Sequence, residues 1–189
     1  MRIKATVVSL MLCLLADPSP AQEMPVPVDL QLSLFLKIVT FNRSLKPQPD
    51  GKLRLGVVYQ GLFRASLLTR EQIEAGCRDL ADKDGAGLLI EVVPLDIHGR
   101  KIEEVLVAGQ VDLLYIAPLR AYDIGEICRL TRRMRILSLT GVPEYSSLGV
   151  AVAIGKRKDM PQIIINLPAA RAEGADFSSQ LLKLARIVD

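Results

Sequence analysis

Aromatic residues and histidine are scarce in this sequence. It has no tryptophan, four phenylalanines, four tyrosines and one histidine, His98. With so few rings the core must be filled mainly by leucine, isoleucine, valine and alanine, and the 50% share of hydrophobic residues suffices for one substantial core. A single histidine excludes a metal site with two histidine ligands and a relay of paired histidines. Because His98 stands beside Gly99 in a predicted loop, we interpret it as a surface imidazole.

The sequence also lacks a strong excess of charge of one sign, and it lacks a glycine-rich loop of the kind that binds phosphate. The 24 Lys and Arg residues against 21 Asp and Glu give a formal charge of +3, which is too small to indicate nucleic-acid binding. Gly85-Ala86-Gly87 lacks the further glycine and the helix of a dinucleotide-binding motif, and Lys52 follows no Walker-type loop. Asp96 and Asp112 adjoin predicted strands without a nucleophile and a base beside them, so we interpret them as caps or solvated ends. We therefore predict a protein that is not an enzyme, with no cofactor and no metal site.

The apolar run at the start of the chain is too short to cross a bilayer. Two basic residues precede Ala5–Ala16, about a dozen residues against the ~20 that a transmembrane helix needs. The run leads to Ser19-Pro20-Ala21, which fits a cleavage site. We predict that residues 1–21 are an export signal, with a buried or anchoring helix as the alternative. The mature chain is then periplasmic, has no integral membrane segment, and consists of an extended leader over 22–29 and one domain over 30–189.

Hydrophobic periodicity predicts an α/β domain. An amphipathic helix is expected first, over Leu30–Leu45. Four predicted strands follow: Leu53–Tyr59, Leu88–Leu95, Val111–Ala117 and Arg135–Thr140. Three predicted helices separate them: Ala65–Lys83, Gly99–Ala108 and Ala121–Arg133. This alternation indicates a single domain with a mainly parallel sheet and helices on both faces. Leu148–Ile154 and Gln162–Leu167 flank a loop over Gly155–Asp159 and predict a C-terminal antiparallel hairpin at one edge.

Two cysteines, Cys77 and Cys128, remain in the predicted mature chain. An exported protein can form disulfides. Right-handed crossovers with the strand order 2-1-3-4 place the two helices that carry these cysteines on opposite faces of the sheet, beyond the reach of a disulfide. We therefore favour two buried free thiols over a Cys77–Cys128 bridge.

Arginine is concentrated on one predicted helix. Arg129, Arg132 and Arg133 are spaced at i, i+3 and i+4 and therefore share a helix face. Such a face could bind an acidic partner, phospholipid headgroups or a small anion. The alternative is a solvated helix C-terminus, where the helix dipole favours cations. The run Lys156-Arg157-Lys158 in the predicted hairpin loop has the same two interpretations.

The C-terminal segment carries the most specific pattern. A strand is followed by a short helix that starts at Pro168 and stops at Gly174, and Ser178 can cap a last apolar helix that runs to the C-terminus. Over Asn166–Val188 and the preceding isoleucine the order is Ile-Asn-Leu-x-Ala-Ala, Ala-x-Gly and Ser-Ser-x-Leu-Leu-x-Leu-Ala-x-Ile-Val. This order resembles the terminal signature of the YfiR-like family.

The resemblance implies a periplasmic α/β protein with a regulatory role. In the best-known member, the protein restrains an inner-membrane diguanylate cyclase by binding its periplasmic part. We therefore expect an inner-membrane signalling protein as partner, with the face of Arg129, Arg132 and Arg133 as the candidate contact. A homodimer is left open, and nucleic acid is not expected. Relatives close their first helix on an aromatic residue followed by proline, whereas Phe41 precedes Asn42 here.

A second resemblance supports an alternative. Leu53–Val58 and Gly109–Pro118 are similar to segments of periplasmic solute-binding proteins, in which the loops after such strands line a ligand cleft. The small-ligand candidates of this alternative are Gln60, Tyr115 and Arg120. We favour the view that both fragments are generic strand-to-helix transitions. A complete solute-binding protein also needs two lobes, for which the mature chain is short.

Overall fold

The computed structural model describes residues 23–45, 48–83 and 89–189, and the expected export signal lies outside them. Its strands are β1 (Lys52–Tyr59), β2 (Leu89–Asp96), β3 (Leu113–Ile116), β4 (Leu137–Thr140), β5 (Val152–Arg157), β6 (Met160–Asn166) and β7 (Arg186–Val188). Its helices are α1 (Val28–Thr40), α2 (Arg64–Lys83), α3 (Ile102–Gly109), α4 (Ile124–Met134), the 3-10 helix η1 (Pro143–Ser146), α5 (Leu167–Ala172) and α6 (Ser179–Leu184). None of the described helices has both the length and the apolar character needed to span a membrane.

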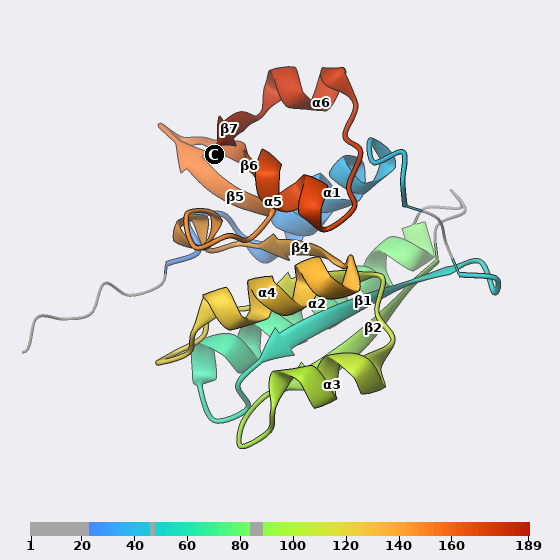
Figure 1. Ribbon diagram of the computed structural model, residues 1–189, viewed down its shortest axis with the longest axis vertical. Helices are drawn as coiled ribbons and strands as arrows, with labels where there is room; N and C mark the ends of the chain where they lie inside the picture. Colours follow the sequence, from blue (N-terminus) through green and yellow to red (C-terminus); the bar gives the residue numbers. More distant parts are fainter. Residues whose placement is uncertain (1–22, 46–47, 84–88) are drawn as a thin grey trace, which may run out of the picture.

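The strands form one seven-stranded sheet in the order β2-β1-β3-β4-β5-β6-β7 (Figure 1). All neighbours are parallel except β5 and β6, which form the antiparallel hairpin. The α/β class, the mainly parallel sheet and the 2-1-3-4 start of the order are confirmed. Because the first four strands are parallel, their carboxyl ends share one edge of the sheet and their amino ends share the other.

The sheet separates two apolar layers, one on each face (Figure 1). Successive residues of β3 show the division: Leu113 and Tyr115 lie in the layer with α1 and α2, whereas Leu114 and Ile116 lie in the layer with α3 and α4. The alternation of a strand produces this division, since neighbouring side chains point to opposite faces. All four side chains are buried, so this strand forms the centre of both layers.

The two cysteines fall into different layers. Cys77 on α2 belongs to the layer with α1, and Cys128 on α4 belongs to the opposite layer. Both are buried free thiols. Burial raises the pKa of Cys77 to about 11 and that of Cys128 to about 12, because the charged thiolate loses its hydration. Both thiols are therefore protonated and unreactive near neutral pH.

Helix α1 is shorter than its periodicity predicts. It ends at Thr40 instead of Leu45, because the chain after it pairs with the C-terminal segment. The amide of Arg43 donates to the Asp176 carbonyl at 3.0 Å, and Asn42 and Phe177 form an isolated antiparallel bridge. The apolar face of α1 is taken up by the core, where Leu32, Phe35 and Ile38 are among its buried residues.

The predicted C-terminal helix is wrong in its second half. Ser178 caps α6 as expected, its hydroxyl accepting from the Leu181 amide at 3.4 Å, but the helix ends at Leu184. Arg186–Val188 then forms β7, parallel to β6 at the outer edge of the sheet. Two β-branched residues, Ile187 and Val188, favour a strand where an unpaired edge offers backbone partners.

The hairpin loop is also tighter than predicted. Gly155, Lys156 and Arg157 continue β5, so the turn consists of Lys158 and Asp159 alone. The strand starts at Val152 and not at Leu148, because η1 and the turn after it, over residues 147–149, precede the strand.

Candidate functional site

The loops after β1 and β3 meet at the carboxyl edge of the sheet. The Arg120 amide donates to Gln60 Oε1 at 2.8 Å, and Gln60 Nε2 donates to the Arg120 carbonyl at 3.1 Å. The guanidinium of Arg120 lies over the Phe63 ring, 5.0 Å from its centre. The side chain of Gln60 is thus hydrogen-bonded to the backbone of Arg120, and both are small-ligand candidates. Such proximity is expected for residues that follow neighbouring parallel strands.

Tyr115, the third small-ligand candidate, lies away from this pair. It is fully buried on the face covered by α1, where its hydroxyl donates to Gln31 Oε1 at 2.7 Å. Gln31 in turn donates to the Val26 carbonyl, and the Phe35 ring meets Tyr115 edge-on with centres 5.8 Å apart. Burial raises the pKa of Tyr115 far above its usual range, so the phenol stays neutral. Its observed contacts join α1 to the sheet.

The three arginines of α4 project from one helix and contact groups of the chain itself. Arg129 pairs with Asp123 at 3.3 Å, and Arg133 pairs with Glu103 of α3. Both ion pairs are exposed, and such pairs contribute about 0–1 kcal/mol, so a partner could compete for these charges. Arg132 differs, because its guanidinium donates to the Gly149 carbonyl at 3.3 Å and holds the loop before β5.

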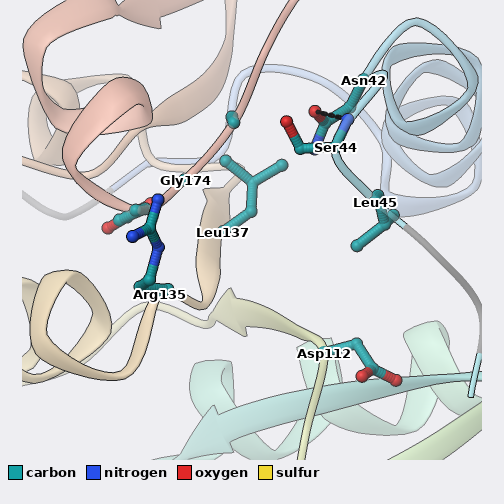
Figure 2. Close-up of a pocket in the computed structure, with 9 residues that line it drawn as sticks. Asn42, Ser44, Leu45, Asp112, Arg135, Leu137 and Gly174 are labelled. Carbon is teal, nitrogen blue, oxygen red and sulfur yellow. Dashed lines mark hydrogen bonds between the residues drawn. The ribbon is translucent and has the colours of Figure 1, made fainter.

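A hollow of about 300 Å³ opens at the amino edge of the sheet (Figure 2). It is lined by Asn42, Ser44, Leu45, Asp112, Arg135, Leu137, Glu173, Gly174 and Ala175. Figure 2 shows Arg135 beside Gly174 on one side and Asp112 on the other, so the two charges lie on opposite sides of the opening. The described groups that line it do not converge on one point as a catalytic array would.

Asp96 and Asp112 bind backbone amides. Asp112 accepts from the Arg54 amide at 2.8 Å, and Asp96 accepts from the Gly61 amide at 3.1 Å and the His98 amide at 2.9 Å. Both carboxylates therefore fix strand ends and the loops next to them. Among the described residues, no group of three or more His, Cys, Asp and Glu side chains is placed to hold a metal.

Glu173 is the buried acid that the sequence interpretation missed. Its side chain accepts from the Thr131 hydroxyl at 2.6 Å, the Ser138 amide at 2.8 Å and the Ser138 hydroxyl at 2.8 Å. Desolvation raises the pKa of Glu173 to about 7, although these hydrogen bonds oppose the shift. The carboxyl group thus links the segment after α5 to both α4 and β4. A signal was present, because Ala169 and Ala170 precede Glu173 by four and three residues and are buried on the same helical side.

The comparisons with known proteins agree with the order and content of these elements. A family model described as YfiR/HmsC-like matches residues 30–186. This chain belongs to the YfiR/HmsC-like family. The match extends from α1 into β7, so it includes residues of both apolar layers, the arginines of α4 and the C-terminal signature as far as Arg186. Comparison with curated proteins gives no match.

Solved structures share the fold of this chain at low identity. An ABC domain from Streptococcus pneumoniae in complex with L-Trp has 15% identity and a TM-score of 0.59, with 86% of this chain and 60% of that chain covered. A conserved domain protein from Vibrio cholerae has 12% identity and a TM-score of 0.56, with 86% and 60% covered. A substrate-binding protein with adhesive properties from Clostridium difficile, in a ligand-free open form, has 17% identity and a TM-score of 0.53, with 87% and 60% covered. This chain therefore spans about 60% of the length of each.

Proposed function

We propose that this chain is a non-catalytic periplasmic regulator that binds the periplasmic part of an inner-membrane signalling protein. A diguanylate cyclase is the partner class to test first. The observation that carries the proposal is the YfiR/HmsC-like match over residues 30–186. The chemistry is compatible with it, since the acidic side chains at the strand ends are engaged by backbone amides.

The regulator would act by shifting the equilibrium between two signalling states of its partner. A chain that binds one signalling state of its partner better than the other changes output only by that difference in affinity. Typical couplings between sites are about 1–3 kcal/mol, or about 5–150-fold. Such a function needs a stable surface and no reacting groups.

The face that we propose for this contact is the exposed side of α4. Arg129 and Arg133 are two of its exposed charges, and their ion pairs with Asp123 and Glu103 lie in solvent. Arg132 contributes charge to the same face but also holds Gly149, so changing it would disturb the loop before β5. A variant that tests the contact should therefore change Arg129 and Arg133 and leave Arg132 in place.

The decisive experiment begins with co-purification from a periplasmic extract, which identifies the protein companion. The double variant Arg129→Glu with Arg133→Glu is then titrated against the companion's periplasmic domain. Weaker binding with a smaller salt dependence is expected, because exposed charges mainly steer association. The matched control is Lys37→Glu with Arg78→Glu, which makes the same change in net charge at exposed positions of α1 and α2. Equal affinity of both variants would remove the α4 face from the proposal, and failure to recover any membrane-protein companion would contradict the regulator itself.

The second candidate function is capture of a small solute at the carboxyl edge. The paired loops of Gln60 and Arg120 favour it, together with a fold shared with an L-Trp complex and a substrate-binding protein. L-Tryptophan is the first probe for calorimetric titration. Binding that is lost in Arg120→Ala but kept in Arg129→Glu with Arg133→Glu would support this function over the regulator. Tyr115, which is buried beneath α1, should affect stability instead.

A further inference from the structure

The β5–β6 hairpin extends beyond the body of the domain (Figure 1). In an ordinary half-buried hairpin, alternate side chains face the core. Here Lys156, Arg157, Met160 and Pro161 are all exposed, although adjacent residues of a strand point to opposite faces. Neither face of the tip is therefore covered by the described helices.

The chemistry of this tip is basic with an apolar side chain next to it. The sequence over its turn is Lys156-Arg157-Lys158-Asp159-Met160. Lys156 pairs with Asp159 at 3.3 Å, so its charge is offset. Arg157 and Lys158 form no ion pair with any described residue, so no neighbouring carboxylate offsets their charges. Met160 is 70% exposed.

The C-terminal segment adds residues of the same kind next to the hairpin. Arg186 pairs with Ile164 of β6, and β7 runs parallel to β6, so β7 begins at its end nearer the hairpin tip. The residues that lead into β7 include Lys183 and Leu184, and Leu184 is 74% exposed. We call the exposed residues Arg157, Lys158 and Met160 of the hairpin, together with Lys183, Leu184 and Arg186 from the segment that leads into β7, the basic pole.

We propose that the basic pole docks on the surface of an anionic phospholipid bilayer. Lysine and arginine are attracted to anionic headgroups, and their long stems can lie along the interface while Met160 and Leu184 enter the acyl boundary. The tip projects from the domain and suits a fluid headgroup layer better than a protein, because specific protein interfaces need about 800 Å² of fitted surface on each side. The inference goes beyond the proposed regulator and rests on it only in placing a membrane nearby.

Sedimentation with large unilamellar vesicles tests the proposal. Vesicles of phosphatidylcholine with about 30 mol% phosphatidylglycerol, an anionic lipid, are compared with vesicles of pure phosphatidylcholine. Both are measured at low and at high salt. The purified protein should sediment with the anionic vesicles alone, and less so at high salt. The tip variant Arg157→Glu with Lys158→Glu should bind at least about tenfold more weakly, since each basic residue near an anionic surface contributes about fivefold.

The same control, Lys37→Glu with Arg78→Glu, separates the basic pole from overall charge. Retained vesicle binding in the control supports the proposal, and an equal loss in both variants overturns it. Replacing Met160 and Leu184 by serine should weaken vesicle binding even at high salt, where the electrostatic contribution is screened.

A tip variant that binds vesicles normally but loses the protein companion would assign the basic pole to an acidic protein instead. Intact companion binding in solution together with no vesicle binding would overturn the lipid inference and leave the proposed regulator standing.

Discussion

Stability should fall as the pH rises through neutrality, because Glu173 holds its proton more tightly in the folded state. Burial raises the pKa of Glu173 from the ordinary 4.5 to about 7. The contribution to the free energy of unfolding is therefore fully present below pH 4.5 and is lost as the pH approaches and passes 7. At about 1.4 kcal/mol for each pH unit, the difference between 4.5 and about 7 amounts to about 3 kcal/mol.

The substitution Glu173→Gln isolates this contribution. Glutamine is neutral at every pH and nearly isosteric with the protonated acid. Its oxygen can accept from the Ser138 amide, and its NH₂ group can donate to the Thr131 hydroxyl, which has the Cys128 carbonyl at 3.1 Å as its own acceptor. The variant should match the wild type near pH 4.5 and become the more stable protein at pH 8.

Urea denaturation from pH 4.5 to 8 measures the effect, with the slope of the unfolding free energy against pH as the result. Glu144→Gln is the matched control, since it removes an exposed carboxyl group and should follow the wild-type slope. Glu173→Ala should be less stable than both at low pH, because the Ser138 amide is left without an acceptor. Parallel curves for the wild type and Glu173→Gln would refute the argument that this carboxyl group is neutral when buried.

Three further predictions concern the C-terminus, the thiols and the export signal. Leu181→Ala should destabilise the domain by about 2–5 kcal/mol in thermal or urea melts, because Leu181 is buried. The exposed Leu184→Ala should change stability by less than about 0.5 kcal/mol. Similar values for the two variants would mean that α6 does not dock as described. Oxidised protein should show two free thiols, Cys77 and Cys128, that label only after denaturation, and a mass lower by two hydrogen atoms would show a bridge. Protein from the periplasmic fraction should have the mass of a chain cleaved near Ala21, and uncleaved protein in the membrane or cytoplasm would refute export.

The order of the sheet could be predicted because local rules determine it. Strands that alternate with helices, right-handed crossovers and short connections leave few arrangements, and the observed order is one of them. The same rules brought Gln60 and Arg120 together, since the loops after neighbouring parallel strands share an edge. They also separated Cys77 from Cys128 by the thickness of the sheet.

Other features depend on contacts that the sequence does not reveal. The residues of β7 fit a helical pattern as well as a strand, and the free edge of β6 decides between them. Tyr115 lies within the expected strand, but which face it points to depends on the register of a four-residue strand buried on both sides. Glu173 is surrounded by small residues whose spacing did mark a buried face, and the donors that satisfy it come from Thr131 and Ser138, more than 30 positions away.

The pairing of the first helix with the C-terminal segment has a consequence for the order in which this protein can mature. Arg43 and Asp176 are 133 residues apart, and the antiparallel bridge beside them joins the exit of α1 to the segment before α6. A ribosome or a translocation channel releases α1 early and Asp176 late, so the contacts at the exit of α1 must wait for nearly the whole chain before they can form. Contacts of such long separation slow folding and leave apolar surface exposed in the meantime. The nascent chain is therefore most vulnerable to aggregation and proteolysis before the segment that precedes α6 arrives, and removing α1 or that segment should have the same outcome, because each completes the other.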